Sequence, residues 1–203
     1  MNPSRSCRRA NRSATIKNPE ELILLLVGVS LLRHCNTSPL GVATTAGIQA
    51  AEGKLYLCAI KDVFSGRIVG YSISDRMKAR LAVNALNNAV SRRRDAAGCI
   101  VHSDHGSQIR ARSFVQTLNR HHLIGSMGTV GAAGDNAAME SFFALLQKNV
   151  LDRKRWRTRE ELRIAIVTWI ERKYRRRRRQ ARLGRLTPIE CETIMNPAVS
   201  LAA

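Results

Sequence analysis

The sequence CIVHSDHGSQ at residues 99–108, followed by GDNAAMESFFALLQK at residues 134–148, decides how the rest of the chain is interpreted. A short apolar run opens the first segment and ends in polar residues, which is typical of a buried strand that delivers Asp104 to the edge of a sheet. Residues 137–151 have the apolar spacing of a helix, with Glu140 in its first turns. The two segments therefore predict a strand, a glycine-rich loop and a helix.

The sequence around these segments predicts a mixed sheet with helices on it. Residues 54–62 and 67–74 are apolar, β-branched runs joined by four residues, which indicates a hairpin. Asp75 can cap a helix from 76 to about 93, where apolar residues recur at helical spacing. After the strand that ends before Asp104 we expect a helix near 113–120 and a weak strand at 123–129. This order of elements predicts an α/β fold with a mixed sheet flanked by helices.

HSDHGSQ, then 35 residues, then the glutamate of DNAAMESFF resembles the integrase core (DDE type) of bacterial insertion-sequence transposases, which are related to retroviral integrases. The resemblance runs from about residue 52 to about residue 195. It implies an RNase H-like fold and metal-assisted DNA strand transfer. That fold has one more strand at its front, which should fall near residues 40–48.

The resemblance also implies a metal site. The family holds two magnesium or manganese ions with three carboxylates: an aspartate on the first strand, an aspartate after a later strand, and a glutamate on the helix. Asp104 and Glu140 match the second and third, and are the expected catalytic and metal-binding residues. Asn136, four residues before Glu140, can share its helix face and orient the carboxylate. His102 is a supporting residue; a strand-end histidine is more often satisfied by hydrogen bonds than bound to a metal.

The first of the three carboxylates is missing. Counting back from Glu52, its place falls at about Thr44, and no aspartate or glutamate occurs between residues 22 and 51. Asp62 matches a different family position, where we expect it to hold the hairpin turn. We therefore expect a truncated or inactive copy of a transposase core. The alternative is a catalytically dead protein that binds DNA or pairs with intact transposase subunits.

The charge of the chain favours a polyanionic partner. The net charge is +19 and the isoelectric point is near 11.2. Residues 153–185 hold 15 lysines and arginines against three glutamates, a balance of +12. The expected DNA contacts are Lys148 and the run Arg175, Arg176, Arg177, Arg178 and Arg179, although a solvated charged face is the plainer interpretation. An unrelated RNA binder is disfavoured, since aromatic residues make up only 4% of the chain.

We expect three parts: a divergent, poorly ordered segment at 1–50, the catalytic core at 51–150, and a basic helical extension at 151–203. In the extension, Thr158 with Glu161 and Thr187 with Glu190 form capping boxes. The apolar run at 22–32 has 11 residues, too few to span a membrane. The five scattered cysteines predict neither disulfides nor a zinc site, which favours the cytoplasm. Expected partners are insertion-sequence ends and target DNA, and further copies of this chain or intact transposase.

Overall fold

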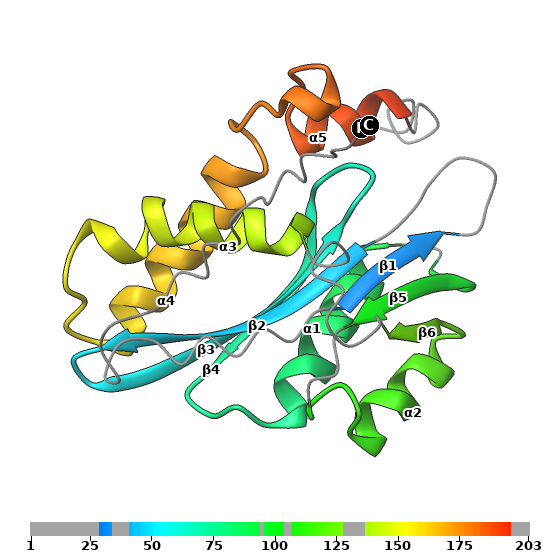
Figure 1. The fold of residues 1–203 in the computed structure, drawn as a ribbon, viewed down its shortest axis with the longest axis horizontal. Coiled ribbons are helices and arrows are strands. Elements are labelled where there is room, and N and C mark those ends of the chain that lie inside the picture. Colours follow the sequence, from blue (N-terminus) through cyan, green and yellow to red (C-terminus); the bar gives the residue numbers. More distant parts are fainter. Residues whose placement is uncertain (1–28, 34–40, 94–95, 104–106, 128–136, 196–203) are drawn as a thin grey trace, which may run out of the picture.

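The computed structural model describes residues 29–33, 41–93, 96–103, 107–127 and 137–195 (Figure 1). Its strands are β1 (Val29–Arg33), β2 (Gly41–Ala50), β3 (Gly53–Asp62), β4 (Ile68–Ser74), β5 (Cys99–Ser103) and β6 (Ile124–Met127). Its α-helices are α1 (Ala79–Arg92), α2 (Arg112–Arg120), α3 (Ala137–Asn149), α4 (Arg159–Thr168) and α5 (Pro188–Met195). Two 3₁₀ turns, η2 (Leu151–Arg153) and η4 (Ala181–Leu183), and a π-helix, η3 (Trp169–Tyr174), complete the elements.

The sheet is mixed, as predicted. β3 pairs antiparallel with both β2 and β4, whereas β5 runs parallel to β2 and to β6. The expected front strand is β2, and the expected hairpin is formed by β3 and β4. β1 also pairs antiparallel with β5; no sequence pattern had predicted this strand.

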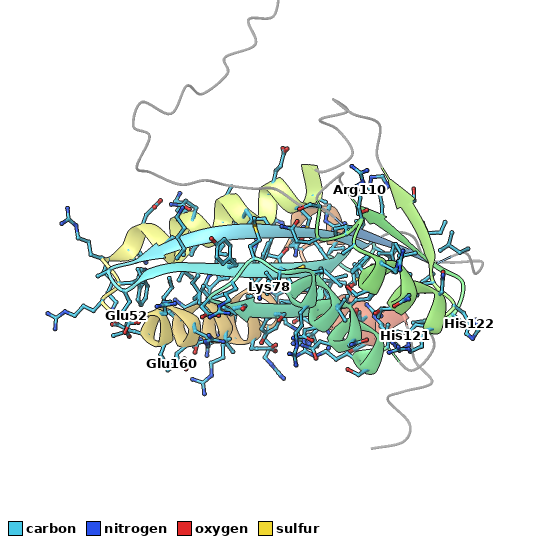
Figure 2. All side chains as sticks on the ribbon, turned by 90° about the horizontal axis from the view of Figure 1, so that it is seen from below. Glu52, Lys78, Arg110, His121, His122 and Glu160 are labelled. Carbon is cyan, nitrogen blue, oxygen red and sulfur yellow. The ribbon has the colours of Figure 1, made fainter. Side chains whose placement is uncertain are left out.

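Each face of the sheet is covered by its own group of apolar side chains. Alternate residues of a strand point to opposite faces, and β3 follows this rule. Ala59 lies in the α3-side cluster, which also holds Leu55, Leu57, Met139, Phe142, Leu146, Leu162, Ile166, Trp169 and Tyr174. Cys58 lies in the α1-side cluster, which also holds Ile60, Val69, Leu81, Ala85, Leu86, Val101, Phe114 and Leu118. Figure 2 shows the sheet edge-on, with α3 on one side and α1 and α2 on the other.

The extension after α3 packs into the same core as the sheet. The ring of Phe142 lies 5.8 Å from that of Trp169 and 5.1 Å from that of Tyr174, measured between centroids. Such pairs stabilise a core beyond the area they bury. α4, η3 and α3 therefore share one apolar interior with the sheet.

Of the two predicted capping boxes, the one at Thr187 is complete, since Glu190 accepts from the N–H of Thr187 at 2.8 Å. Glu161 instead accepts from the N–H of Arg157, at 3.3 Å, so the box at Thr158 is only half formed. Thr158 accepts a hydrogen bond from the backbone N–H of Glu161 at 3.1 Å, and Thr187 accepts one from Glu190 at 3.2 Å. Asp62 holds the hairpin turn as expected, since its Oδ1 accepts from the N–H of Phe64 at 2.9 Å. The cap predicted for α1 is wrong.

α1 begins at Ala79, and its N-cap Lys78 makes no side-chain cap bond. Asp75 instead lies within ion-pair distance of Arg76 and Arg159, at 4.0 and 3.9 Å. The carboxylate of Asp75 thus lies near two guanidinium groups and does not cap α1. The helix starts three residues later than predicted.

Candidate metal and DNA site

The strand and the helix predicted on either side of the glycine-rich loop are both present. β5 ends at Ser103, directly before Asp104, and Glu140 is an exposed residue in the first turn of α3. Asp104 and Asn136 lie outside the described residues. The expectation that the carboxyl groups of Asp104 and Glu140 approach within reach of a two-metal site, about 10 Å, therefore remains a prediction.

The place of the missing acid lies in a described strand. Thr44 pairs with Ala59 across β2 and β3, and Thr45 pairs with Cys58. Ala59 belongs to the α3-side cluster and Cys58 to the α1-side cluster. Directly paired residues of antiparallel strands share a face, so position 44 stands on the face that carries α3 and Glu140. No residue of β2 is an aspartate or glutamate.

His102 is engaged within the sheet. It is half-buried, and its Nδ1 lies 3.3 Å from Oγ of Ser126 on β6. The backbone register places these two residues side by side. This contact matches the hydrogen-bonded alternative for His102 that the sequence left open.

The five consecutive arginines do not share one environment. Arg175 is only 6% exposed and forms an ion pair with Glu171 of η3, whereas Arg176, Arg177 and Arg179 are exposed and Arg178 is half-buried. Burial lowers the pKa of Arg175, and the nearby Arg67 acts in the same direction. A DNA contact by this run therefore falls to its exposed members.

Lys148 lies in the last turn of α3 and is exposed. Glu140 and Lys148 are eight positions apart, which corresponds to about 12 Å along a helix. Lys148 thus lies on the same helix as the candidate site residue, and its ammonium group is free to meet solvent or a phosphate.

Sequence reasoning missed Lys61. This side chain is 4% exposed, and its Nζ donates a hydrogen bond of 2.7 Å to the carbonyl oxygen of Ala138, in the first turn of α3. Burial lowers the pKa of Lys61 to about 7, helped by the positive charges of Arg182 and Arg178. Its signal was its position: residues 55, 57 and 59 of β3 all face α3, and 61 continues that alternation.

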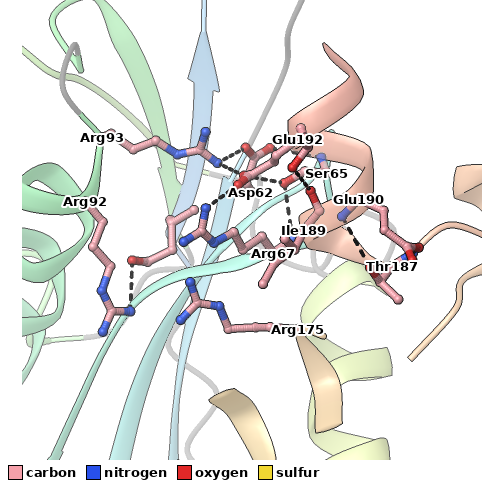
Figure 3. A network of polar contacts seen from close by, with 12 residues as sticks. Asp62, Ser65, Arg67, Arg92, Arg93, Arg175, Thr187, Ile189, Glu190 and Glu192 are labelled. Carbon is pink, nitrogen blue, oxygen red and sulfur yellow. Dashed lines mark hydrogen bonds and ion pairs between the residues drawn. The ribbon is translucent and has the colours of Figure 1, made fainter. Parts of the chain in front are cut away.

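A cluster of charged side chains joins the hairpin, α1 and α5 (Figure 3). Arg93 donates to Asp62 and, at 2.5 Å, to Glu192, while Ser65 donates to Glu192 at 3.0 Å. Burial raises the pKa of Asp62, although the positive charge of Arg93 opposes this shift. Asp62 is thus engaged by the backbone of the turn and by Arg93.

The described residues alone do not form a metal site. Magnesium and manganese prefer carboxylate oxygens, and the described part of the chain contains no group of three or more histidines, cysteines, aspartates or glutamates placed to hold a metal. β2, the strand on which the family's first acid is expected, contains no aspartate or glutamate and so brings no carboxylate to such a group.

Within the described ranges, no helix is long and apolar enough to cross a membrane.

Two sequence models, both described as "Integrase core domain", match residues 42–133 and 121–188. The transposase InsF of insertion sequence IS3A from Escherichia coli K12 is 38% identical over 145 residues, which are 71% of this chain and 50% of that protein. The transposase of IS629 from Shigella sonnei is 37% identical over 153 residues, 75% of this chain and 51% of that protein.

This chain spans about half the length of these curated relatives. Among solved structures, the HTLV-2 integrase catalytic core in complex with magnesium matches with a TM-score of 0.54 and 16% identity, over 73% of this chain and 92% of the other. The catalytic core of BIV integrase matches with a TM-score of 0.54 and 14% identity, over 77% and 95%. These likenesses confirm the RNase H-like fold. By its sequence matches, the chain belongs to the integrase-core transposases of insertion sequences.

Proposed function

We propose that this chain is the core of an insertion-sequence transposase that binds DNA but, for want of the first metal-binding carboxylate, does not join DNA strands. The family membership supports the first half, since the relatives are named transposases. The second half rests on one observation: β2 lies in the sheet at the expected place and brings no carboxylate to it.

The register of the sheet supports the choice of Thr44. β2 and β5 run parallel with Gly41 opposite Val101 and Val42 opposite His102, a constant offset of 60 positions. Thr44 follows Val42 by two residues and Asp104 follows His102 by two, which is why we combine these two positions in the proposed site. Ala59, the partner of Thr44 on β3, belongs to the cluster beneath α3, the helix that carries Glu140. The proposed site thus combines positions 44, 104 and 140, and the first of them is uncharged.

The roles of the remaining acids follow from their chemistry. The carboxylates of Asp104 and Glu140 would hold Mg²⁺ or Mn²⁺, which supplies an activated water or 3′-hydroxyl and relieves charge at the phosphorus. A hard dication held by two carboxylates loses the negative charge that the third would add. The hydroxyl group of a threonine at position 44 is uncharged and cannot replace that negative charge.

The test is a strand-joining assay on duplexes that end in the DNA flanking the chain's own coding region, in Mg²⁺ and in Mn²⁺. We expect no joined product from the unaltered chain and a metal-dependent product from Thr44→Asp. Thr45→Asp is the matched control, because it adds the same charge one residue along the strand, whose side chains alternate between faces. Thr44→Asp combined with Glu140→Gln should again be inactive.

Two results would count against the proposal. Metal-dependent joining by the unaltered chain would show that another acid completes the site, and Asp62→Asn would then test the nearest one. A Thr44→Asp protein that folds and binds DNA but joins nothing would contradict the placement of the missing acid at Thr44.

The second candidate function is interference with active transposase, through shared DNA or mixed oligomers. It is favoured by the exposed Arg176, Arg177 and Arg179 on a core whose fold is intact. Adding this chain to a joining reaction run by an active relative should lower the yield as its concentration rises. No effect at a large excess would reject the interference.

A further inference from the structure

Lys61 is a buried cation that the apolar core does not need. It is the penultimate residue of β3, on the face where its neighbours Leu55, Leu57 and Ala59 are apolar and completely buried. No described carboxylate forms an ion pair with its ammonium group. Burial of an unpaired charge is costly, and an unbranched apolar side chain such as methionine would fill the same place without that cost.

The hydrogen bond of Lys61 reaches the part of α3 that carries the candidate site. Its acceptor, the carbonyl oxygen of Ala138, lies 77 positions along the chain and 2.7 Å away. Ala138 is the second residue of α3, and Glu140 follows in the same turn. The bond therefore joins the sheet to the single turn that presents Glu140.

The apolar contacts of α3, which include Met139 in its first turn, do not by themselves fix the orientation of that turn. Met139, Phe142 and Leu146 are fully buried and attach one face of the helix to the sheet. Apolar contacts are non-directional, whereas a charge-assisted hydrogen bond demands a donor at a set distance and angle from its acceptor.

We propose that Lys61 is a positioning residue: by its hydrogen bond to Ala138 it holds the first turn of α3, and with it the carboxylate of Glu140, against the end of the sheet. This role rests on the proposed function insofar as Glu140 is a site residue. The physical coupling between Lys61 and the turn does not depend on catalysis. Arg178 and Arg182, the other charges that act on Lys61, belong to the segment after η3 and are cations, so neither competes as an acceptor.

The test is amide hydrogen exchange in α3, measured residue by residue at about pH 6. In Lys61→Met we expect the exchange protection of the Phe142 amide, which pairs with the carbonyl of residue 138 in an α-helix, to fall about tenfold, the size of one charged hydrogen bond. Protection of the last turn, at Leu146 to Asn149, should stay unchanged.

Two further variants separate positioning from general destabilisation. Lys54→Met removes a lysine from the exposed end of the same strand and should leave α3 unaffected. Lys61→Arg keeps a cationic donor and should restore most of the protection. Equal loss of protection along all of α3, or none at Phe142, would overturn the proposal. The exchange measurement uses neither metal nor DNA, so its outcome is independent of the strand-joining assay. The positioning role of Lys61 can be rejected while Thr44→Asp restores joining, and it can be supported while Thr44→Asp does not.

Discussion

Glu192 on α5 forms an ion pair with Arg67 at the start of β4, 125 positions earlier in the chain. The side chains of both residues are largely shielded, with 13% and 24% of their surface exposed. Arg93, at the end of α1, donates to the same carboxylate. Three segments of the chain are thus joined at one side chain of the last helix.

Glu192→Gln should therefore destabilise the fold by about 2 kcal/mol, because two partly buried guanidinium groups lose their charged acceptor. Urea unfolding measures the change. Glu160→Gln is the control, since it removes the same charge from a side chain that is 69% exposed and paired with Arg163, and exposed pairs contribute at most about 1 kcal/mol. Equal effects of the two substitutions would show that the Glu192 cluster adds nothing specific.

Gly70 lets α1 pack closely on β4. A Cβ at this position would lie 2.3 Å from the carbonyl oxygen of Ala85 and 2.6 Å from Cβ of Ala89. Gly70→Ala should lower the free energy of unfolding by about 1–3 kcal/mol or more, because helix backbone must shift. In the control Gly125→Ala the new Cβ meets only the tip of Leu118, at 3.3 Å. A neutral Gly70→Ala would mean that the helix yields freely.

The exposed arginines should account for part of the salt dependence of DNA binding. Replacing Arg176, Arg177 and Arg179 by serine should flatten the plot of log affinity against log salt by about 0.9 for each phosphate that is no longer neutralised. Fluorescence anisotropy with a duplex of arbitrary sequence gives the slope. A matched triple serine variant of the exposed Arg110, Arg112 and Arg120 removes the same charge elsewhere. If both triple variants give one slope, only net charge matters and the run is a solvated face.

Lys61 should make the stability of the protein rise with pH. Its pKa is about 7 in the folded chain and 10.5 in the unfolded one, so between these values the unfolded state binds more protons and folding gains as pH increases. Lys61→Met should lack this rise and be the more stable protein near pH 7. Lys54→Met, exposed on the same strand, should keep it. Parallel stability curves for the unaltered chain and Lys61→Met would contradict the pKa shift.

Local signals predicted most of the fold. Alternating apolar residues identified the β3–β4 hairpin, and the capping boxes at Thr158 and Thr187 fixed the starts of α4 and α5, since each depends on residues within one turn. The strand before Asp104 and the helix with Glu140 were also predicted. The expectation that these two elements form one site came from the family resemblance and not from any local sequence pattern.

Features set by distant contacts escaped the sequence. In the sequence, Arg175–Arg179 is a uniform run of positive charge. In the structure it follows the π-helix η3, and the N–H of Arg175 donates to the carbonyl oxygen of Ile170. Arg175 is buried and forms an ion pair with Glu171. From the sequence, Lys61 is an ordinary lysine at the end of a strand, whereas in the structure α3 packs over it and it is buried. Asp75 reads as a cap until Arg159 comes within reach. In each case the environment of the side chain depends on a residue of another element, or on an unusual helical turn, that the sequence pattern does not predict.

The exposure of Glu140 bears on what the loss of an acid would do to the stability of this fold. Its side chain is exposed, and the apolar clusters and the Glu192 ion pairs are formed by other residues. A mutation that removes an acid from the site therefore leaves the folding free energy nearly unchanged. Cellular proteases act on unfolded chains, so they would not remove a protein that lacks an acid but folds normally. Such a protein would last as long as one that keeps the acid.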